Sequence, residues 1–462
     1  MTDPRDDLDT WMQAQIKPLP PPPGTFELIR KRARRRKMTR AAAAAAGAVA
    51  VIAVIATVPR LVITQLNVGP GPAASGAQVG QTSSAGTHHH QQSAAATPQP
   101  TPDTGSPGTA PPAAPPNFAA TSVTFVSTTT GYVLGQAGTP GQCGPPKPYI
   151  CTSLAGTDDG GKTWHGVSAP VTGAAKGPNG VSQVRFYNTS DGWAFGPELW
   201  ATHNGGKSWQ QVSTGGLRVT ALETAGQRVF AVWAQCSGTG ASWAAGCTGQ
   251  TLYSAAPGSN RWAPVPGAVA SLNLNGTASA AALMLTSSRG YLLPPSGVLD
   301  SGPVSNAGGW APVTGAVVPC LPGAAQADGQ PSGALLAAAG TSGLVLVCPD
   351  AAAGRVVYTS TDDGHTWQRA GLAPTAGTAT SVAGTSTGSI VLASTAGLEV
   401  SRDGGATWTA ARGALPPGGF SYVGMTTADQ GVAVPADTSL HAVWLTYDGG
   451  ATWHESPINQ PS

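Results

Sequence analysis

The chain has 462 residues, of which only 10% are charged, with 24 Lys or Arg against 22 Asp or Glu. Abundant Gly (62) and Pro (41) favour an all-β protein with many turns and an added linker. The charges are unevenly placed, because residues 1–40 hold ten Lys or Arg against five Asp or Glu, whereas the other 422 residues hold fourteen against seventeen. The near-neutral total therefore hides a basic head on a slightly acidic body, and no nucleic-acid partner is expected.

Residues 1–40 and 41–64 are predicted to be a basic cytoplasmic head and a transmembrane helix. Basic side chains cluster from Arg30 to Arg40, and the 18 uncharged, mostly apolar residues Ala41–Val58 follow, enough to cross a bilayer. Because positive residues stay inside, we expect a single-pass cell-membrane protein with a cytoplasmic N-terminus and an extracytoplasmic bulk. A nucleic-acid patch is the alternative for the cluster, and a cleaved signal peptide is the alternative for the span. The long basic region and the lack of a small-residue cleavage site favour an uncleaved anchor.

Residues 65–117 are predicted to be a disordered linker of Pro, Gly, Ala, Ser and Thr, since such a segment cannot bury a core. His88–His90 within it are interpreted as a solvated polar tract rather than a loose metal site. The head either orients the anchor or docks to a cytoplasmic partner. Residues 118–462 form the predicted folded domain.

An eight-residue phrase, S/T-x-D/N-x-G-x-T/S-W, recurs five times in that domain, and we call its copies the Trp turns. They span 157–164, 202–209, 360–367, 401–408 and 446–453. The gap between Trp209 and Trp367 fits three units. Two degenerate copies of the phrase, both without the Asp, end within this gap at Trp262 and Trp310. The full series is therefore seven units of about 48 residues, which predicts a seven-bladed β-propeller with four strands in each blade.

A second phrase supports this count, because units open with an apolar strand, a polar turn and a second strand that starts at Gly. Examples are Val123–Gly131 followed by Tyr132, and Val184–Gly192 followed by Trp193. The Trp turn then joins the third and fourth strands.

The residues of the Trp turns have structural duties in this interpretation. Gly supplies positive φ, the Asp and the Ser or Thr side chains accept bonds from turn amides, and Trp packs over the hairpin. The predicted structural residues are Thr157, Asp159, Gly161, Trp164, Thr202, Asn204, Gly206, Trp209, Ser360, Asp362, Gly364, Trp367, Ser401, Asp403, Gly405, Trp408, Thr446, Asp448, Gly450 and Trp453.

Six cysteines fall in the exported domain and predict disulfides. Fifteen connectivities are possible, and pairing of sequence neighbours is favoured: Cys143 with Cys151, Cys236 with Cys247, and Cys320 with Cys348. All six map to the face opposite the Trp turns. The long insertions 136–149, 235–250, 294–309 and 319–333 are placed on that face too. Either this face binds a partner, or the disulfides only pin its loops.

The Trp-turn phrase resembles the Asp-box, or BNR, repeat, and the seven copies cover about three quarters of the chain. Such repeats occur in sialidases, xyloglucan-degrading glycosidases, sortilin-type receptors and photosystem II assembly factors. The seven units with a Gly-aromatic second strand look most like the photosystem II assembly factors and other WD40/YVTN/BNR-like repeat proteins. Sialidases are similar at the level of the fold alone. The resemblance implies a non-enzymatic assembly scaffold.

A glycosidase is the competing enzyme hypothesis, but the sialidase Arg-Ile-Pro phrase is absent and Glu is scarce after the anchor. A glycosidase needs two facing carboxylates. Isolated candidates such as Asp158, Asp191, Asp300 and Asp350 have no motif around them. We therefore predict no catalytic residue, cofactor or metal site. The expected function is a membrane-anchored scaffold that binds an envelope protein or glycan on the loop face. The alternative is a sensor that signals to a cytoplasmic partner.

Overall fold

The computed structural model describes residues 111–137, 151–173, 179–236, 247–268, 281–294, 297–320, 333–350 and 352–458. The predicted head (1–40), the predicted transmembrane helix (41–64) and most of the predicted linker lie outside the described residues. Within the described ranges no helix has the length and hydrophobicity needed to cross a membrane. The chain divides into Met1–Thr101 and Pro102–Ser462, and everything below concerns the second unit.

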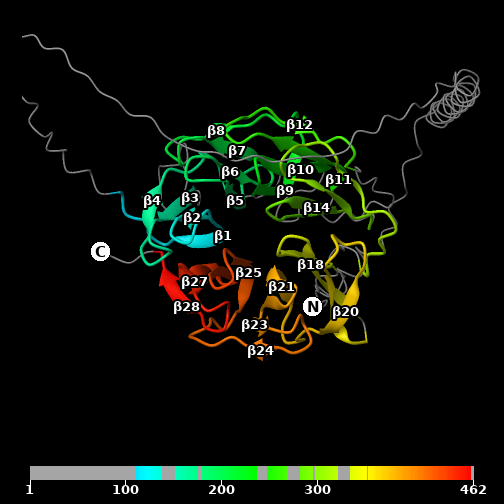
Figure 1. Cartoon of the computed structure of the whole chain (residues 1–462). Coiled ribbons are helices and arrows are strands. Elements are labelled where there is room, and N and C mark those ends of the chain that lie inside the picture. Colours follow the sequence, from blue (N-terminus) through cyan, green and yellow to red (C-terminus); the bar gives the residue numbers. More distant parts are fainter. Residues whose placement is uncertain are drawn as a thin grey trace, which may run out of the picture. The chain divides into compact units, whose positions relative to one another are not determined.

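Seven four-stranded antiparallel sheets make up this unit, each formed by four consecutive strands in simple up-and-down order. The sheets are arranged around a common centre as the blades of a propeller (Figure 1). The prediction of an all-β, seven-bladed propeller is therefore confirmed. The strands are β1(Ala119–Phe125), β2(Gly131–Ala137), β3(Cys151–Thr157) and β4(His165–Val167) in blade 1; β5(Gln183–Phe186), β6(Gly192–Phe195), β7(Leu199–Thr202) and β8(Gln210–Gln211) in blade 2; β9(Arg218–Ala225), β10(Arg228–Cys236), β11(Cys247–Ala255) and β12(Ala263–Pro264) in blade 3; β13(Ala282–Leu285), β14(Arg289–Leu293), β15(Asp300–Pro303) and β16(Ala311–Pro312) in blade 4; β17(Leu335–Ala339), β18(Gly343–Asp350), β19(Gly354–Ser360) and β20(Gln368–Leu372) in blade 5; β21(Ala379–Ser386), β22(Ser389–Ser394), β23(Gly397–Ser401) and β24(Thr409–Ala410) in blade 6; and β25(Phe420–Met425), β26(Gly431–Pro435), β27(Ala442–Thr446) and β28(His454–Pro457) in blade 7.

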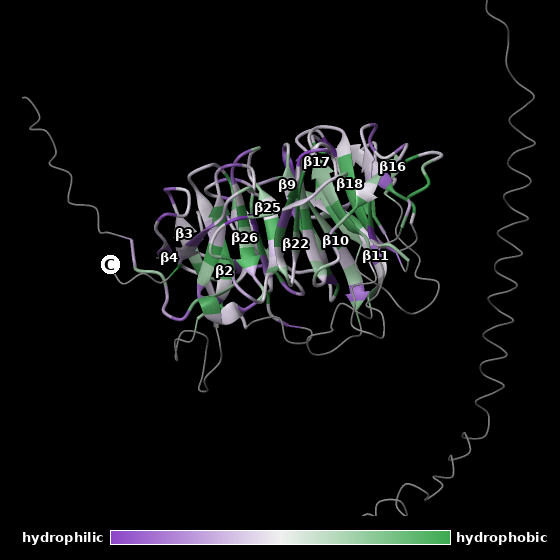
Figure 2. Cartoon of the chain, turned by 90° about the horizontal axis from the view of Figure 1, so that it is seen from below, coloured by the Kyte–Doolittle hydropathy of each residue, from purple (hydrophilic) through white to green (hydrophobic). Residues whose placement is uncertain are grey.

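Burial changes systematically across each blade. The second strands are buried on both faces, as β6 and β26 show at every residue, whereas the fourth strands are short and mostly exposed. Hydrophobic residues accordingly run along the strands, while many turns at their ends are hydrophilic (Figure 2). This pattern follows from stacking blades face to face, which removes both faces of each second strand from water.

A Gly at the first or second position of four of the second strands has a packing reason. A Cβ atom on Gly131 or Gly192 would lie 2.7 or 2.6 Å from the ring of Phe125 or Phe186, each at the end of the preceding strand. Gly290 and Gly431 have equally close neighbours in Trp310 and Met425. The Gly-aromatic phrase therefore marks the place where a large side chain folds back over the second strand.

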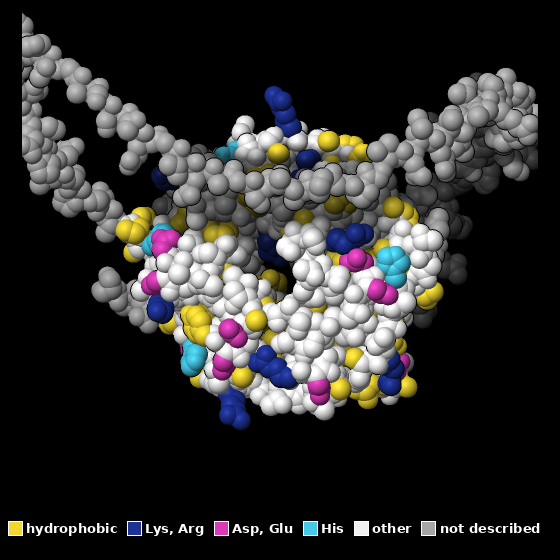
Figure 3. All heavy atoms as spheres, viewed as in Figure 1, with side chains coloured by type: hydrophobic (Ala, Val, Ile, Leu, Met, Phe, Trp, Pro, Cys, Tyr) yellow, Lys and Arg dark blue, Asp and Glu magenta, His cyan; other side chains and the backbone are white. Residues whose placement is uncertain are grey.

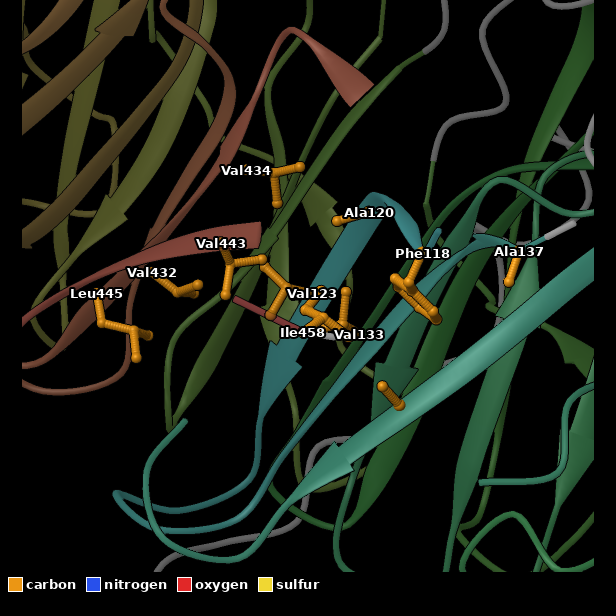
Figure 4. Close-up of a cluster of buried hydrophobic side chains, with 11 residues drawn as sticks. Phe118, Ala120, Val123, Val133, Ala137, Val432, Val434, Val443, Leu445 and Ile458 are labelled. Carbon is orange, nitrogen blue, oxygen red and sulfur yellow. The ribbon is translucent and has the colours of Figure 1, made fainter. Parts of the chain in front are cut away.

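The ring closes between blades 7 and 1 without a shared strand, because β1 to β4 all belong to blade 1 and β25 to β28 all belong to blade 7. A buried hydrophobic cluster fills this seam (Figure 4). Blade 1 contributes Phe118, Val123 and Val133, among others, and blade 7 contributes Val443 and Leu445. Apolar packing thus replaces the backbone pairing that a strand exchanged between the blades would provide.

Hydrogen bonds at the outer part of the seam fix its register. Trp164 Nε1 donates to Ser456 Oγ at 2.9 Å, and that hydroxyl donates to the carbonyl of Gly161. Tyr447 Oη donates to the carbonyl of Gly160 at 3.0 Å. Blade 7 therefore holds the Trp turn of blade 1 through side-chain bonds to its backbone.

We predict that Ser456→Ala lowers the free energy of unfolding by about 1–3 kcal/mol, because the Trp164 indole and the Gly161 carbonyl lose a buried partner. Chemical denaturation of the variant measures this loss. Ser386→Ala, at an exposed serine, is the matched control and should change stability by less than about 0.5 kcal/mol. Equal effects of the two substitutions would contradict the role given to Ser456.

Two segments differ from the predictions. Residues 111–117 were assigned to the disordered linker, but Ala113 pairs with His165 and Gly166 N donates to the Pro112 carbonyl at 2.7 Å. This segment therefore lies along the outer edge of blade 1. Residues 294–309 were predicted to be one loop, but they contain β15, because a strand of the sequence Asp-Ser-Gly-Pro carries no apolar signal.

Candidate functional site

The Trp turns all lie on one end of the propeller. Each joins the third and fourth strands of its blade, and each Trp of the series, including Trp262 and Trp310, immediately precedes a fourth strand. Backbone bonds tie these turns to the first turn of the same blade, as from Gly160 N to Thr129 O at 2.7 Å and from Gly205 N to Ser190 O at 2.8 Å. We call this end the Trp-turn face and the opposite end the loop face.

The five complete Trp turns share one hydrogen-bond pattern. In the first, Thr157 Oγ1 donates to Asp159 Oδ1 at 2.8 Å and accepts from Gly161 N at 2.8 Å, while Thr163 N donates to Asp159 Oδ1 at 2.9 Å. The corresponding bonds in the other four measure 2.7–3.0 Å. The side-chain oxygens of the Ser or Thr and of the Asp or Asn thus form hydrogen bonds within each turn.

These bonds hold the turn carboxylates in the charged form. Burial acts to raise the pKa of Asp159, but hydrogen bonds from Thr163, Thr157 and Lys162 outweigh it and lower the pKa to about 2. Hydrogen bonds from Thr366 and Thr407 lower the pKa of Asp362 and of Asp403 to about 2. The carboxylates are therefore ionised acceptors at neutral pH.

We predict a loss of stability in acid that originates in these turns. Their folded-state pKa of about 2 lies below the unfolded value of about 3.9, so their contribution is complete above about pH 4 and falls as the pH drops towards 2. Asn204 occupies the same place in the second turn and makes equivalent bonds. Asp403→Asn should therefore fold, and its unfolding free energy should fall less steeply between pH 4 and 2 than that of the wild type. An unchanged slope in denaturant titrations would contradict this assignment.

The third complete Trp turn departs from the others at its fourth residue. Four turns have Gly there, with φ between +70° and +80°, whereas Asp363 adopts a φ of +60°. Its carboxylate accepts from Tyr291 Oη at 2.5 Å and lies 3.6 Å from Arg289 Nε, both on β14 of blade 4. Burial and this bond raise the pKa of the Tyr291 phenol. Asp363 thus anchors blade 5 to blade 4, whose own Trp turn lacks the Asp.

The predicted structural residues do not converge on one site, because each turn belongs to a different blade. The favoured cysteine pairings are confirmed for Cys236–Cys247 and Cys320–Cys348. The proposed Cys143–Cys151 pair lies outside the described side chains. Most residues of the predicted loops 136–149, 235–250 and 319–333 also lie outside the described residues.

The four isolated carboxylates are likewise dispersed, one each on blades 1, 2, 4 and 5. Asp158 is exposed and lies 4.0 Å from His165, and Asp191 Oδ1 lies 2.8 Å from His203 Nδ1. Asp350 accepts bonds from two backbone amides, and Asp300 is buried in β15. Among the described residues, no three His, Cys, Asp or Glu side chains are grouped so as to hold a metal ion.

The cavity of interest lies instead at the centre of the ring. It has a volume of about 420 Å³ and is lined by the first strands of blades 2 to 7. Figure 3 shows that the ring is hollowed at its centre and that a basic side chain lies on the wall of the hollow. This volume is within the range of sites that bind small molecules or single side chains. We call it the axial cavity.

One wall of the axial cavity carries an ion pair between neighbouring blades. Arg185 on β5 contacts Glu223 on β9. The Nε atom of Arg185 donates to the two carboxylate oxygens at 3.0 and 3.1 Å, and its Nη2 atom lies 3.0 Å from Oε1. Arg185 Nη1 also donates to the Val184 carbonyl at 2.9 Å. The side chains are 14% and 26% exposed. The guanidinium is thus held rigidly by charge-assisted bonds.

A tyrosine from blade 7 extends this cluster. The Arg185 guanidinium lies 6.0 Å from the ring centroid of Tyr422 on β25. Burial acts to lower the pKa of Arg185, but the Glu223 carboxylate outweighs burial and holds that pKa above its ordinary value. Burial raises the pKa of Tyr422 and outweighs the opposing effect of Arg185. Arg185 is therefore charged, and Tyr422 is a neutral hydroxyl.

Sequence reasoning missed this cluster. Arg185 and Glu223 stand 38 positions apart in the sequence, and no motif links them. The available signal was their location, because both interrupt the apolar strand that opens a unit. A charged residue on the innermost strand of a propeller faces either a neighbouring blade or the central channel.

We predict that Glu223→Gln lowers the free energy of unfolding by roughly 1.5–3 kcal/mol at pH 7, because Arg185 keeps its charge and loses its charged partner. The matched control is Glu455→Gln on β28, where the side chain is exposed. A double-mutant cycle with Arg185→Met isolates the coupling between the two residues. A coupling near zero would show that the pair adds nothing to stability.

No protein-family model and no curated protein matches the chain. Among solved structures it is similar to YCF48 bound to a D1 peptide, with 16% identity over 73% of this chain and 99% of that one and a TM-score of 0.45. It is also similar to YCF48 from Cyanidioschyzon merolae, with 13% identity, 60% and 86% coverage and a TM-score of 0.40. An ancestral GH74 enzyme gives 13% identity, 76% coverage of this chain, 47% of that chain and a TM-score of 0.45. Such low values indicate no more than a general likeness, and the propeller assignment rests on the strand pairing described above.

Proposed function

We propose that this protein is a membrane-anchored, extracytoplasmic scaffold whose propeller binds an envelope protein without catalysing a reaction on it. The observation that carries the proposal is the axial cavity. Six blades line it, and its polar side chains are fixed by contacts between blades. A preorganised recess of this kind loses little conformational freedom when a partner enters, and this favours binding.

The state of the cavity carboxylate supports binding over hydrolysis. Glu223 is the one Asp or Glu among the described residues that line the cavity, and both of its carboxylate oxygens accept hydrogen bonds from Arg185. Glycoside hydrolysis uses two carboxyl groups, one with a raised pKa that makes it an acid. A carboxylate fixed by a guanidinium serves as a structural acceptor and is unsuited to the role of proton donor.

The disulfides support the proposed location. Two cystine bridges join strand ends or connections in blades 3, 4 and 5, and such bridges persist in oxidising compartments outside the cytoplasm. In the proposal residues 41–64 anchor the chain, and the linker gives the propeller reach above the membrane. The Trp turns are Asp-box repeats that act as hairpin braces in this scheme.

We expect a photo-crosslinker at the axial cavity to capture a specific protein. Benzoylphenylalanine replaces Leu335, which lines the cavity, in the full chain in its native membranes. The matched control replaces Leu372, an exposed leucine on the outer strand β20. The Leu335 position should yield one protein adduct at least about tenfold more abundant than any adduct from Leu372.

A parallel assay with sialoside and glucan substrates tests the enzyme alternative. Sugar release that Glu223→Gln abolishes, together with no specific adduct at Leu335, would contradict the scaffold proposal. Capture of an envelope protein with no release of sugar agrees with it.

A further inference from the structure

The two sides of the axial cavity differ in the polarity of their side chains. On one side Tyr422, Arg185 and Glu223 form a row from blade 7 to blade 3, and Ser122 of blade 1 lies 3.5 Å from Arg185 Nη1. Blades 4 to 6 line the other side, where small side chains are frequent. Those small residues are Ala282, Ala334, Ala337, Ala338, Ala383 and Gly384. The space of about 420 Å³ therefore lies between a polar row and a predominantly apolar wall.

The axial cavity has no net charge. Arg185 and Glu223 are its only Lys, Arg, His, Asp or Glu among the described lining residues, and their charges are opposite and in contact. A charged group that entered would lose its hydration and find no unpaired counter-charge, which disfavours its entry. An uncharged apolar group would gain from leaving water. The cavity is thus built to select against ions.

One hydroxyl is left to recognise a polar atom. Thr380 Oγ1 donates to the Phe420 carbonyl at 2.7 Å, and Ser381 Oγ donates to the Val423 carbonyl at 3.2 Å, so both hydroxyl protons are used in the wall. The Tyr422 hydroxyl forms no hydrogen bond with another described residue. It is neutral and lines the cavity, and it can therefore donate to a carbonyl oxygen of a ligand.

Two methionines complete the lining. Met284 on β13 and Met425 on β25 both contact the cavity. Methionine is flexible and polarisable, so it adapts to differently shaped apolar groups. A whole helix, 10–12 Å across, exceeds the capacity of a space of 420 Å³, whereas one large side chain and part of its backbone fit.

We propose that the axial cavity takes one uncharged apolar side chain, such as Phe or Leu, from an extended segment of the partner protein, with a carbonyl oxygen of that segment accepting from Tyr422. This inference rests on the proposed scaffold function and adds the chemistry of the bound group. The neutral Arg185–Glu223 pair sets the preference for an uncharged residue.

The native methionines provide the readout. The chain has five: Met284 and Met425 line the cavity, while Met1, Met12 and Met38 belong to the predicted head and serve as internal controls. The full chain is labelled with ¹³C-methyl methionine in detergent and titrated with N-acetylphenylalanine amide. We expect saturable shifts of Met284 and Met425 alone. N-acetyllysine amide and N-acetylaspartate amide should bind at least about tenfold more weakly. Equal binding of the three probes, or no saturable shift, overturns the proposal.

Two variants test the individual groups. Glu223→Gln leaves the Arg185 charge unpaired and should reverse the preference towards N-acetylaspartate amide by about tenfold or more. Tyr422→Phe removes one hydroxyl and keeps the ring, so it should weaken the phenylalanine probe severalfold while thermal unfolding stays cooperative. A Tyr422→Phe protein that binds all three probes like the wild type contradicts the role given to the hydroxyl.

The outcome is separable from that of the scaffold proposal. Partner capture at Leu335 with no probe binding to the wild type would overturn the inferred chemistry and leave the scaffold function standing. Probe binding with no captured partner would overturn the scaffold function and leave the cavity as a site for small uncharged molecules.

Discussion

The fold depends on one constraint, which is that each blade has two apolar faces and neither can remain in water. Seven blades satisfy it by stacking in a closed ring, so that every second strand is covered on both sides. The ring closes at the seam between blades 7 and 1, where the first and last blades meet without exchanging a strand. There the hydrophobic cluster around Phe118 and Val443 and the Trp164–Ser456–Gly161 bonds join the two ends of the domain.

The Trp turns stabilise the individual blades. They fix the hairpin between the third and fourth strands and place an indole next to the outer strand. The Trp turn of blade 4 lacks the Asp, and there Asp363 of blade 5 accepts a hydrogen bond from Tyr291 of blade 4.

The sequence predicted what depends on local or periodic signals. The spacing of the seven Trp residues indicated the blade count, and short sequence separations indicated the pairings Cys236–Cys247 and Cys320–Cys348. It did not predict that Ala113 lies along the edge of blade 1, because a Pro- and Ala-rich segment has no strand signal of its own. The Arg185–Glu223–Tyr422 cluster was also missed, because only ring closure brings blades 2, 3 and 7 to one axis.

In the proposed function the partner binds at that axis. The most direct measurement is an experimental structure of the full chain bound to the partner that it captures. We predict that an extended segment of the partner enters the axial cavity and places an uncharged apolar side chain against Met425, next to the Tyr422 hydroxyl. A partner bound only on the loop face or the outer strands, with the axial cavity holding nothing but water, would contradict the account.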